Sequence, residues 1–300
     1  MNSAAVPKVV VIGAGPAGLA AAVQLLRQGI EPLVFEAAAP GGLLRNADWV
    51  ENYPGFPGGI TGPLLVKRFV EQALRTGVRI TAEEVLRLTW AGRAFEVKTS
   101  RSGYQADFAV VASGTKPKRL GRPPLTVGAA DGVFYEIAPI WNVRNKRIAV
   151  IGAGDAAFDY ALHLSRHNQV LILNRGREVR CLPLLRERSS TRKGIRYFEA
   201  AVVRAIDRSP GGRFRIEAGT RPGRDEAFLV DFIIAAIGRT PRTDFLGRGG
   251  PLPVAALEKK GRLHFAGDVR NGRERQTAIA VGDGLRAAMR ISRIVQERRP

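Results

Sequence analysis

The fold is decided by the stretch Val9-Val-Val-Ile-Gly13-Ala-Gly15-Pro-Ala-Gly18. Its β-branched run predicts a buried strand, and the glycines follow where that strand would turn into a helix. The first glycine permits a tight turn, the second lets the backbone approach a pyrophosphate, and the third lets helix and strand pack closely. Glu36 ends the next predicted strand, 23 residues after Gly13. The whole pattern predicts a dinucleotide-binding βαβ unit in which Glu36 accepts hydrogen bonds from ribose hydroxyls.

The uncharged run Val9–Leu26 is 18 residues long, long enough to resemble a membrane span. Its glycines and proline interrupt it where a strand would meet a helix, and only Lys8 precedes it in place of a basic segment. We therefore expect neither a membrane span nor a targeting segment. A glycine-rich turn can also serve packing alone, but strand, helix and acid at this spacing favour the nucleotide interpretation.

A second unit of the same kind follows, with its first glycine 139 residues after Gly13. The predicted strand Arg147–Ile151 leads into Gly152-Ala-Gly154-Asp-Ala-Ala157, and a helical stretch and another strand follow. That next strand, Val170–Leu173, is followed by Asn174 at 22 residues after Gly152, where the first unit has an acid. Gly152, Gly154 and Ala157 are therefore predicted to bind a second dinucleotide.

Arginines follow this second strand at once, at Arg175, Arg177 and Arg180. An acid here would repel a 2′-phosphate, whereas a neutral residue followed by arginines offers it forked donors and positive charge. The sequence therefore predicts NADPH rather than NADH, with Arg175 and Arg180 as ligands of the phosphate. The alternative is that these arginines belong to a solvated basic face.

Length and composition indicate two folded domains, because the chain has 300 residues of which 45% are hydrophobic. The net charge is +20, which favours anionic ligands or an acidic partner. That charge is uneven: residues 1–115 carry +2, residues 116–240 carry +11 and residues 241–300 carry +7. The middle segment is therefore a candidate for a separate domain.

The chain has one cysteine and three histidines. One cysteine cannot form an intrachain disulfide, and together these residues offer no plausible zinc cluster. We expect no metal site. A reducing cytoplasm suits such cysteine usage.

Further ordered motifs make the chain resemble the low-molecular-weight thioredoxin reductases. The similarity runs from Val9 to about Val295. Besides the two fingerprints it rests on short segments spread along the chain: Pro40-Gly41-Gly42, residues 50–57 (VENYPGFP), residues 60–65 (ITGPLL), Ala112-Ser113-Gly114-Thr115, residues 236–241 (AIGRTP), Phe265-Ala266-Gly267-Asp268 and Arg275-Gln276-Thr277-Ala278.

The resemblance implies an α/β protein with two Rossmann-like, three-layer dinucleotide-binding domains. A discontinuous FAD domain would comprise residues 1–115 and 241–300, and an NAD(P)H domain, residues 116–240, would be inserted into it. This insertion coincides with the change in charge. Members of this family form homodimers, so the resemblance implies a homodimer here as well.

The resemblance also implies the flavin site. Gly42 and Asn52 would lie along the flavin and ribityl chain, and Asp268 would bind ribityl or neighbouring oxygens, unless it is only a turn or capping residue. Arg275 and Gln276 would open the last helix, whose N-terminal N–H groups would stabilise negative charge on the reduced flavin. The expected FAD residues are Gly13, Gly15, Gly18, Glu36, Gly42, Asn52, Gly114, Gly267, Asp268, Arg275 and Gln276.

One departure from the family decides the expected function. The family carries a Cys-x-x-Cys pair after a Gly-Val-x-Tyr segment, and here Gly132-Val-Phe-Tyr135 is followed by Glu136-Ile-Ala-Pro139. Thiol–disulfide exchange needs an attacking and a resolving thiol, so a dithiol relay cannot run through this position. Glu136 is a weak catalytic candidate near the flavin, or an exposed loop carboxylate. Trp141 would cover the flavin or fill a domain interface, and Cys181 is expected to be a bystander.

The leading prediction is an FAD-dependent NAD(P)H oxidoreductase that transfers hydride from NADPH to FAD. Its acceptor would not be a disulfide, and could be an acidic ferredoxin or flavodoxin, a quinone or a small molecule. The alternative is a regulatory flavoprotein that binds both nucleotides without turnover. Nucleic-acid binding is disfavoured, because aromatic residues make up only 7% of the chain and do not alternate with the arginines.

Overall fold

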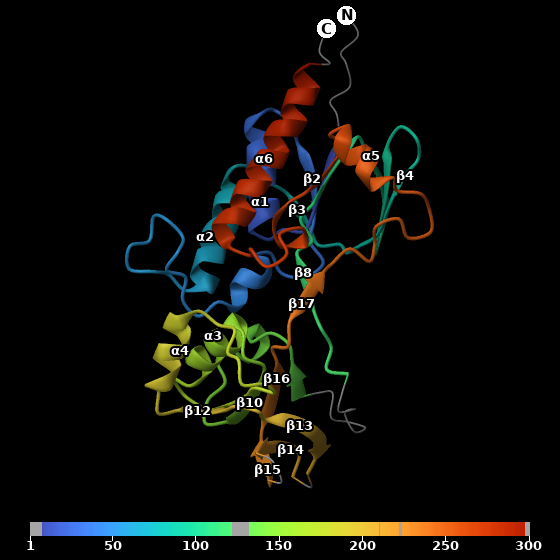
Figure 1. The fold of residues 1–300 in the computed structure, drawn as a ribbon. Coiled ribbons are helices and arrows are strands. Elements are labelled where there is room, and N and C mark those ends of the chain that lie inside the picture. Colours follow the sequence, from blue (N-terminus) through green and yellow to red (C-terminus); the bar gives the residue numbers. More distant parts are fainter. Residues whose placement is uncertain (1–7, 122–131, 210, 222–223, 298–300) are drawn as a thin grey trace, which may run out of the picture. The chain divides into compact units, whose positions relative to one another are not determined.

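The computed structural model describes residues 8–121, 132–209, 211–221 and 224–297 (Figure 1). The chain divides into two compact units. The first comprises Met1–Arg45, Glu51–Lys116 and Thr240–Pro300, and the second comprises Asn46–Val50 and Pro117–Arg239. Nothing in the sequence indicates that residues 46–50 group with the second unit.

The first unit is built on a parallel five-stranded sheet in the order β18-β7-β1-β2-β3. The strands are short and apolar: β1 (Val9–Ile12), β2 (Pro32–Phe35), β3 (Ile80–Thr81), β7 (Phe108–Val111) and β18 (Leu263–Phe265). Side chains alternate across β1 because successive residues of a strand point to opposite faces. Val9 and Val11 pack with helices, whereas Val10 and Ile12 pack in a separate core on the other face.

Helices cover one face of this sheet and an antiparallel sheet covers the other. The helices are α1 (Pro16–Arg27), α2 (Gly62–Arg75) and α6 (Thr277–Gln296), with α5 (Val254–Lys259) preceding β18. α1 and α6 lie side by side (Figure 1). Their close approach requires glycine at position 284, since a Cβ there would collide with the Ala17 carbonyl oxygen. The antiparallel sheet consists of β4 (Val85–Trp90), β5 (Phe95–Thr99) and β6 (Gly103–Ala106).

The second unit repeats this three-layer plan. Its parallel sheet has the order β12-β11-β10-β16-β9. The strands are β9 (Val133–Phe134), β10 (Arg147–Ile151), β11 (Gln169–Leu173), β12 (Ile195–Phe198) and β16 (Phe232–Ala235). One face packs against α3 (Asp155–Leu164) and the other against an antiparallel sheet of β13 (Val202–Arg208), β14 (Phe214–Arg221) and β15 (Arg224–Val230). The helix α4 (Pro183–Ser190) lies beside α3.

The predicted fold class, α/β with two Rossmann-like parallel sheets, is confirmed. The strands predicted at Val9–Ile12 and Arg147–Ile151 form with those bounds. The mostly apolar run of residues 229–235 would suggest one strand, but it belongs to two, because the chain changes sheets at Asp231. Asp231 exchanges bonds with Arg147: its N–H donates to the Arg147 carbonyl at 2.7 Å, and its carboxylate accepts from the Arg147 N–H at 2.7 Å.

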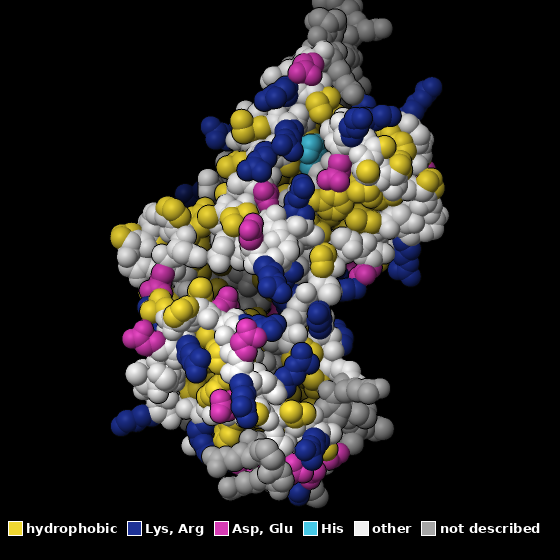
Figure 2. All heavy atoms as spheres, viewed as in Figure 1, with side chains coloured by type: hydrophobic (Ala, Val, Ile, Leu, Met, Phe, Trp, Pro, Cys, Tyr) yellow, Lys and Arg dark blue, Asp and Glu magenta, His cyan; other side chains and the backbone are white. Residues whose placement is uncertain are grey.

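Two short strands, β8 (Thr115–Pro117) and β17 (Arg239–Pro241), pair with each other where the chain passes from one unit to the other. Lys and Arg side chains are scattered among acidic ones over the face shown in Figure 2 and form no single basic stripe there. In the part of the chain that the structure describes, no helix is long and apolar enough to cross a membrane.

Candidate functional site

In the first glycine turn, Gly13 and Gly18 are tightly packed, whereas Gly15 borders open space. Gly13 has a φ of +103°, and a Cβ there would collide with the Ala112 carbonyl oxygen. A Cβ at Gly18 would collide with the Gly13 carbonyl oxygen, so only glycine fits either position. Gly15 precedes α1 with an ordinary φ of −77°, and a Cβ there would come no closer than 3.8 Å to any neighbour, the Gly42 Cα. Gly15 therefore faces the space in which a pyrophosphate could lie.

Glu36 is fixed against this turn by two backbone bonds. Its Oε2 accepts from the Ala14 N–H at 2.8 Å, and its Oε1 accepts from the Ala38 N–H at 2.9 Å. Carboxylate oxygens have further lone pairs, so Glu36 can still accept from ribose hydroxyls. Gly42 opens the short helix η1 (Gly42–Asn46), and a Cβ there would lie 3.4 Å from the Gly15 Cα. Glu36 and Gly42 thus lie beside the same turn.

The residues predicted near the start of α6 also come together. The Asn52 side-chain amide donates to Gln276 Oε1 at 2.8 Å, and Gln276 is the N-cap of α6 without a side-chain cap bond. The Nε of Arg275 is buried and has no partner in the described residues. A buried donor without an acceptor is costly, so a missing acidic or carbonyl ligand is expected here. The donors of this set fit a flavin.

The turn before α6 depends on a residue that the sequence did not single out. Asp283 of α6 accepts from the Gly267 N–H at 3.2 Å and from the Asn271 side chain at 2.7 Å. Gly267 has a φ of +77°, and Asp268 follows it, half-buried, in the short helix η4 (Gly267–Val269). Gly114 has a φ of +64° with open space around its Cα. In the sequence, Asp283 could have been recognised only as an acidic residue on the buried side of an amphipathic helix.

In the second glycine turn, as in the first, the first glycine is tightly packed and the second borders open space. Gly152 has a φ of +135°, and a Cβ there would collide with the Ala236 carbonyl oxygen. Gly154 is the N-cap of α3 with a φ of −98°, and a Cβ there would meet only the Arg180 carbonyl oxygen at 3.8 Å. Ala157 is fully buried against the sheet. The open position is again the second glycine.

Asn174 holds the loop after β11 rather than facing a ligand. It is buried, and its side-chain amide donates to the Glu178 carbonyl at 3.0 Å and to the Tyr197 hydroxyl at 2.8 Å, while its Oδ1 accepts from the Gly176 N–H at 3.1 Å. Both donor bonds of its side-chain amide are therefore made within the protein. Asn174 therefore differs from Glu36 in two ways: it carries no charge, and its side chain holds the loop after β11 together.

The arginines of this loop differ in availability. Arg180 pairs with Glu178, whose Oε2 lies 2.8 Å from Nη2 and 3.0 Å from Nε. Arg175 is exposed and has no ion-pair partner among the described residues. Sequence reasoning missed Glu178, which competes with a phosphate for Arg180. Arg175 is thus the better placed of the two predicted phosphate ligands.

Glu136 is an ion-paired residue of the second unit. Its Oε1 accepts from Arg239 Nη2 at 3.0 Å, and its Oε2 accepts from the Asn46 side chain at 3.3 Å. The same Asn46 accepts from the Ala138 N–H at 2.9 Å. Burial raises the pKa of Tyr160 on α3 above its usual range, with Arg239 opposing and Glu136 adding to the shift. Glu136 is therefore half-buried and fixed, and not an exposed loop carboxylate.

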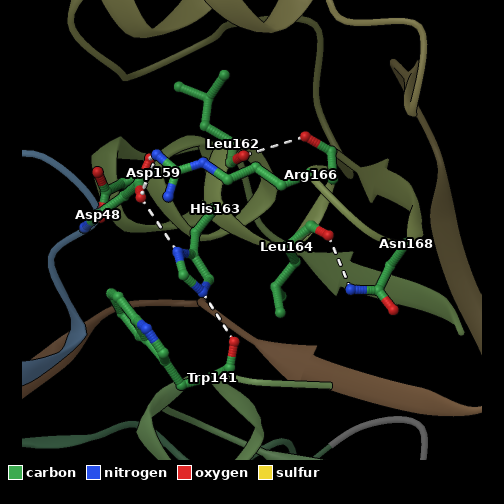
Figure 3. Close-up of polar contacts among 9 residues, drawn as sticks. Asp48, Trp141, Asp159, Leu162, His163, Leu164, Arg166 and Asn168 are labelled. Atoms are coloured by element: carbon green, nitrogen blue, oxygen red, sulfur yellow. Dashed lines mark hydrogen bonds and ion pairs between the residues drawn. The ribbon is translucent and has the colours of Figure 1, made fainter. Parts of the chain in front are cut away.

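Asp48 joins the segment 46–50 to α3 (Figure 3). Its carboxylate is buried and accepts a hydrogen bond from Arg166, whose Nη2 lies 2.9 Å from Asp48 Oδ1. The same Oδ1 lies 3.1 Å from His163 Nδ1. Its N–H donates to Asp159 at 2.9 Å. Burial is the main cause that raises the pKa of Asp159 to about 7, and the neighbouring Asp48 carboxylate adds to it. None of these residues was predicted.

Trp141 stacks on His163 within the second unit. The ring centroids lie 3.7 Å apart with planes at 33°, and His163 Nε2 lies 2.9 Å from the Trp141 carbonyl oxygen. The indole is partly buried and packs against the core around α3. Its described contacts are thus those of a packing residue.

Cys181 is half-buried beside the same core. Burial raises the pKa of its thiol, and the nearby Asp155 carboxylate raises it further. The thiolate is the reactive form, so this environment makes the thiol less reactive. In the described part of the chain, no group of three or more His, Cys, Asp or Glu residues could hold a metal ion.

Comparisons with known proteins agree with this arrangement. Residues 7–284 match the profile of the family described as pyridine nucleotide-disulphide oxidoreductase. The thioredoxin reductase of Mycolicibacterium smegmatis is 31% identical over 318 residues, which cover 99% of each chain. The crystal structure of Lactococcus lactis thioredoxin reductase has a TM-score of 0.85 at 27% identity and covers 97% of this chain and 99% of that one.

A bacillithiol disulfide reductase from Bacillus cereus is similar in fold alone, with a TM-score of 0.75 at 22% identity over 98% of this chain and 99% of that one. FAD and NADPH, the cofactors predicted from the sequence, are those of the matched family. The two glycine turns described above fit this assignment. The chain belongs to the pyridine nucleotide-disulphide oxidoreductases.

Proposed function

We propose that this chain is an FAD-dependent oxidoreductase that takes hydride from NADPH and passes the electrons on without a dithiol of its own. One observation carries the proposal. The chain has a single cysteine, Cys181, and the position at which the resembling family has its redox pair holds Glu136, ion-paired to Arg239. An acceptor would therefore take electrons directly from the flavin.

The first glycine turn is the proposed FAD site. Bound FAD would supply the two-electron chemistry that amino-acid side chains lack. Gly15 and Gly42 leave room for the pyrophosphate, and Glu36 would bind the ribose. Asn52, Arg275 and Gln276 would bind the flavin end, where the first N–H groups of α6 favour negative charge. Gly13, Gly18, Gly114, Gly267 and Asp268 would shape the remaining backbone.

The second glycine turn is the proposed NADPH site. Gly152 and Ala157 allow the turn to pack, and Gly154 leaves the N-terminus of α3 open to the pyrophosphate. Arg175 would bind the 2′-phosphate without competition, and Arg180 would have to exchange Glu178 for it. Domains 1–115 with 241–300 and 116–240 would then be the FAD and NADPH domains respectively.

Glu136 is proposed as an electrostatic residue rather than a proton donor. A carboxylate held by a guanidinium and an amide N–H acts as an acceptor. In this pair the arginine cancels the negative charge that would otherwise disfavour an anionic reduced flavin. The neutral Tyr160 phenol beside it adds no charge.

The acceptor class follows from charge. A net charge of +20 would steer an acidic ferredoxin or flavodoxin toward the protein, chiefly by raising the association rate. Quinones and small molecules are the other candidates, since they also meet a flavin directly. A homodimer is proposed by analogy with the resembling family.

Anaerobic titration with NADPH tests the proposal. The purified chain should be yellow, and NADPH should bleach the flavin band stoichiometrically. Retained colour without bleaching would instead support the alternative, a flavoprotein that binds nucleotides without turnover. Adding a panel of acceptors to the reduced protein then identifies the acceptor. Rapid NADPH-dependent reduction of thioredoxin would contradict the proposal that the acceptor is not a disulfide.

A further inference from the structure

Gly267 is the residue at which the chain leaves the parallel sheet of the first unit. The N–H of the preceding Ala266 still donates to the Val111 carbonyl of β7, at 3.0 Å. The N–H of Gly267 donates instead to Asp283 Oδ2 at 3.2 Å. Because Gly267 is buried, its N–H depends on an acceptor from the protein, and Asp283 supplies one. The chain beyond the sheet is therefore tied to a side chain of α6.

The same carboxylate oxygen also holds the segment that follows. The Asn271 side-chain amide donates to Asp283 Oδ2 at 2.7 Å. The side chain of Asp283 is only 13% exposed, and its other oxygen lies 3.9 Å from Arg286 Nη1. One residue of α6 thus fixes the start and the middle of the segment 267–276, whose last residue is the N-cap of the same helix.

The packing of α6 on α1 determines where Asp283 and Gly267 lie. Gly284, next to Asp283, lies against α1, since a Cβ there would collide with the Ala17 carbonyl oxygen. Gly267 lies between the same two helices, because a Cβ there would be 3.0 Å from the Ala17 Cβ and 3.4 Å from the Ala280 Cβ. The contact between Asp283 and Gly267 is therefore set by tightly packed backbone.

The Gly267 turn lies at the edge of the sheet where the proposed FAD site begins. Strands β18 and β1 lie on either side of β7 and run parallel to it, so their carboxyl ends share one edge. In α/β sheets, ligands bind beyond this edge. Ala17, which lies against Gly267, belongs to the first turn of α1, and the N-terminus of α1 is the proposed pyrophosphate site. A shift of the Gly267 turn would therefore move Asp268, the next residue, relative to that site.

We infer that Asp283 is a positioning residue for FAD, which holds Gly267 and Asn271 so that the Gly267–Asp268 turn is in place before the cofactor binds. The inference rests on the proposed FAD site, since Asp283 would act through the turn and Asp268. Without this carboxylate the buried Gly267 N–H would lose its acceptor, and glycine has little conformational preference of its own. The turn would then have to become ordered as FAD binds, and this cost would weaken binding.

The dissociation constant of FAD tests the inference, measured by ultrafiltration of the FAD-loaded protein and the fluorescence of the released flavin. Asp283→Ala should raise this constant about tenfold, because a buried N–H loses its acceptor. Asp283→Asn should raise it by at most about threefold, because its amide oxygen can still accept from the Gly267 N–H. Asn271→Ala should give a value between those of the unchanged protein and Asp283→Ala, since it removes one of the two hydrogen bonds.

A double-mutant cycle with Asp268→Ala separates positioning from general stabilisation. If Asp283 acts through the turn, adding Asp283→Ala to Asp268→Ala should raise the dissociation constant by less than about threefold, instead of the roughly tenfold expected for independent residues. A carboxylate that only stabilised the unit would lower the free energy of unfolding and show no coupling to Asp268. Asn271→Ala enters the same cycle, so the test does not depend on the folding of Asp283→Ala.

Arg286→Gln is the matched control, because it removes a charge 3.9 Å from Asp283 Oδ1 and leaves both hydrogen bonds of Oδ2 in place. It should bind FAD as tightly as the unchanged protein. If FAD binds but its dissociation constant is unchanged in Asp283→Ala and Asn271→Ala, or if their losses add fully to that of Asp268→Ala, the inference is wrong and the FAD site stands. If the unchanged protein binds no FAD, the proposed function fails together with the inference.

Discussion

The glycine turn after β1 and the glycine turn after β10 are alike at the backbone and differ in the side chains that follow. In both, the first glycine has a positive φ and lies against a carbonyl oxygen, while the second has an ordinary φ and open space. After β2, however, Glu36 bonds back to its turn, whereas after β11 Asn174 bonds within its own loop and to Tyr197 of β12. The shared part is the proposed binding site for a pyrophosphate, and the part that differs would select the nucleotide.

The largest effect is expected from filling the open glycine of each turn. Gly15→Val should abolish flavin retention and leave the chain folded, because a Cβ there makes only an ordinary contact, 3.8 Å from the Gly42 Cα, and projects toward the proposed pyrophosphate path. Gly154→Val should keep the flavin and lose reduction by NADPH. Bound flavin after gel filtration and the circular dichroism spectrum are the two measurements.

Gly103→Val is a suitable control for both variants, since a Cβ there meets nothing within 4 Å. It should keep flavin and NADPH reduction. Full flavin in Gly15→Val, or loss of flavin in Gly154→Val, would break the comparison between the two turns.

The helices that follow the two turns differ in buried charge, and pH should reveal it. α1 carries no acidic residue, whereas α3 carries Asp159 with a pKa raised from 3.8 to about 7. The folded state then holds a proton that the unfolded state has lost between about pH 4 and about pH 7. The free energy of unfolding should therefore fall as the pH rises through this window, by about 2–4 kcal/mol, and then level off.

Asp159→Asn should flatten this dependence and raise the free energy of unfolding at pH values above 7. Urea unfolding followed by circular dichroism at a series of pH values provides the measurement. An Asp159→Asn variant with the same pH profile as the unchanged protein would show that the burial of this carboxyl contributes nothing to stability.

These contrasts show which parts the sequence could predict. The strands and glycine turns were predictable because they depend on neighbours in the chain: β-branched runs, glycines and the next acid. The Asp48–His163 contact joins residues 115 positions apart, and nothing local to Asp48 indicates it. Arg180 illustrates an intermediate case, because its competitor Glu178 is only two residues away but the pairing depends on how the loop turns.

A smaller effect is expected at the loop after β11, where the two predicted phosphate ligands can be separated. Arg175→Ala should lower the preference for NADPH over NADH by roughly tenfold to a hundredfold, the loss of a charge-assisted contact of about 1.5–3 kcal/mol. Arg180→Ala should cost less, because Arg180 would have to give up its pair with Glu178 to bind a phosphate. Glu178→Gln should raise the preference. Ratios of kcat/KM for the two nucleotides decide, and an unchanged ratio in Arg175→Ala would assign the arginines to a solvated face.

The smallest effect is expected at Cys181, which lies beyond the same loop. Burial and Asp155 keep its thiol protonated, and no second cysteine in the chain could resolve a disulfide formed with it. Cys181→Ser should therefore leave the reduction of an artificial acceptor by NADPH within about twofold, because a bystander cysteine contributes only packing. NADPH-dependent reduction of thioredoxin should be undetectable in both proteins. Robust thioredoxin reduction that disappears in Cys181→Ser would instead place a working thiol beside the second glycine turn, and the two turns would then differ in redox chemistry as well as in the nucleotide that they select.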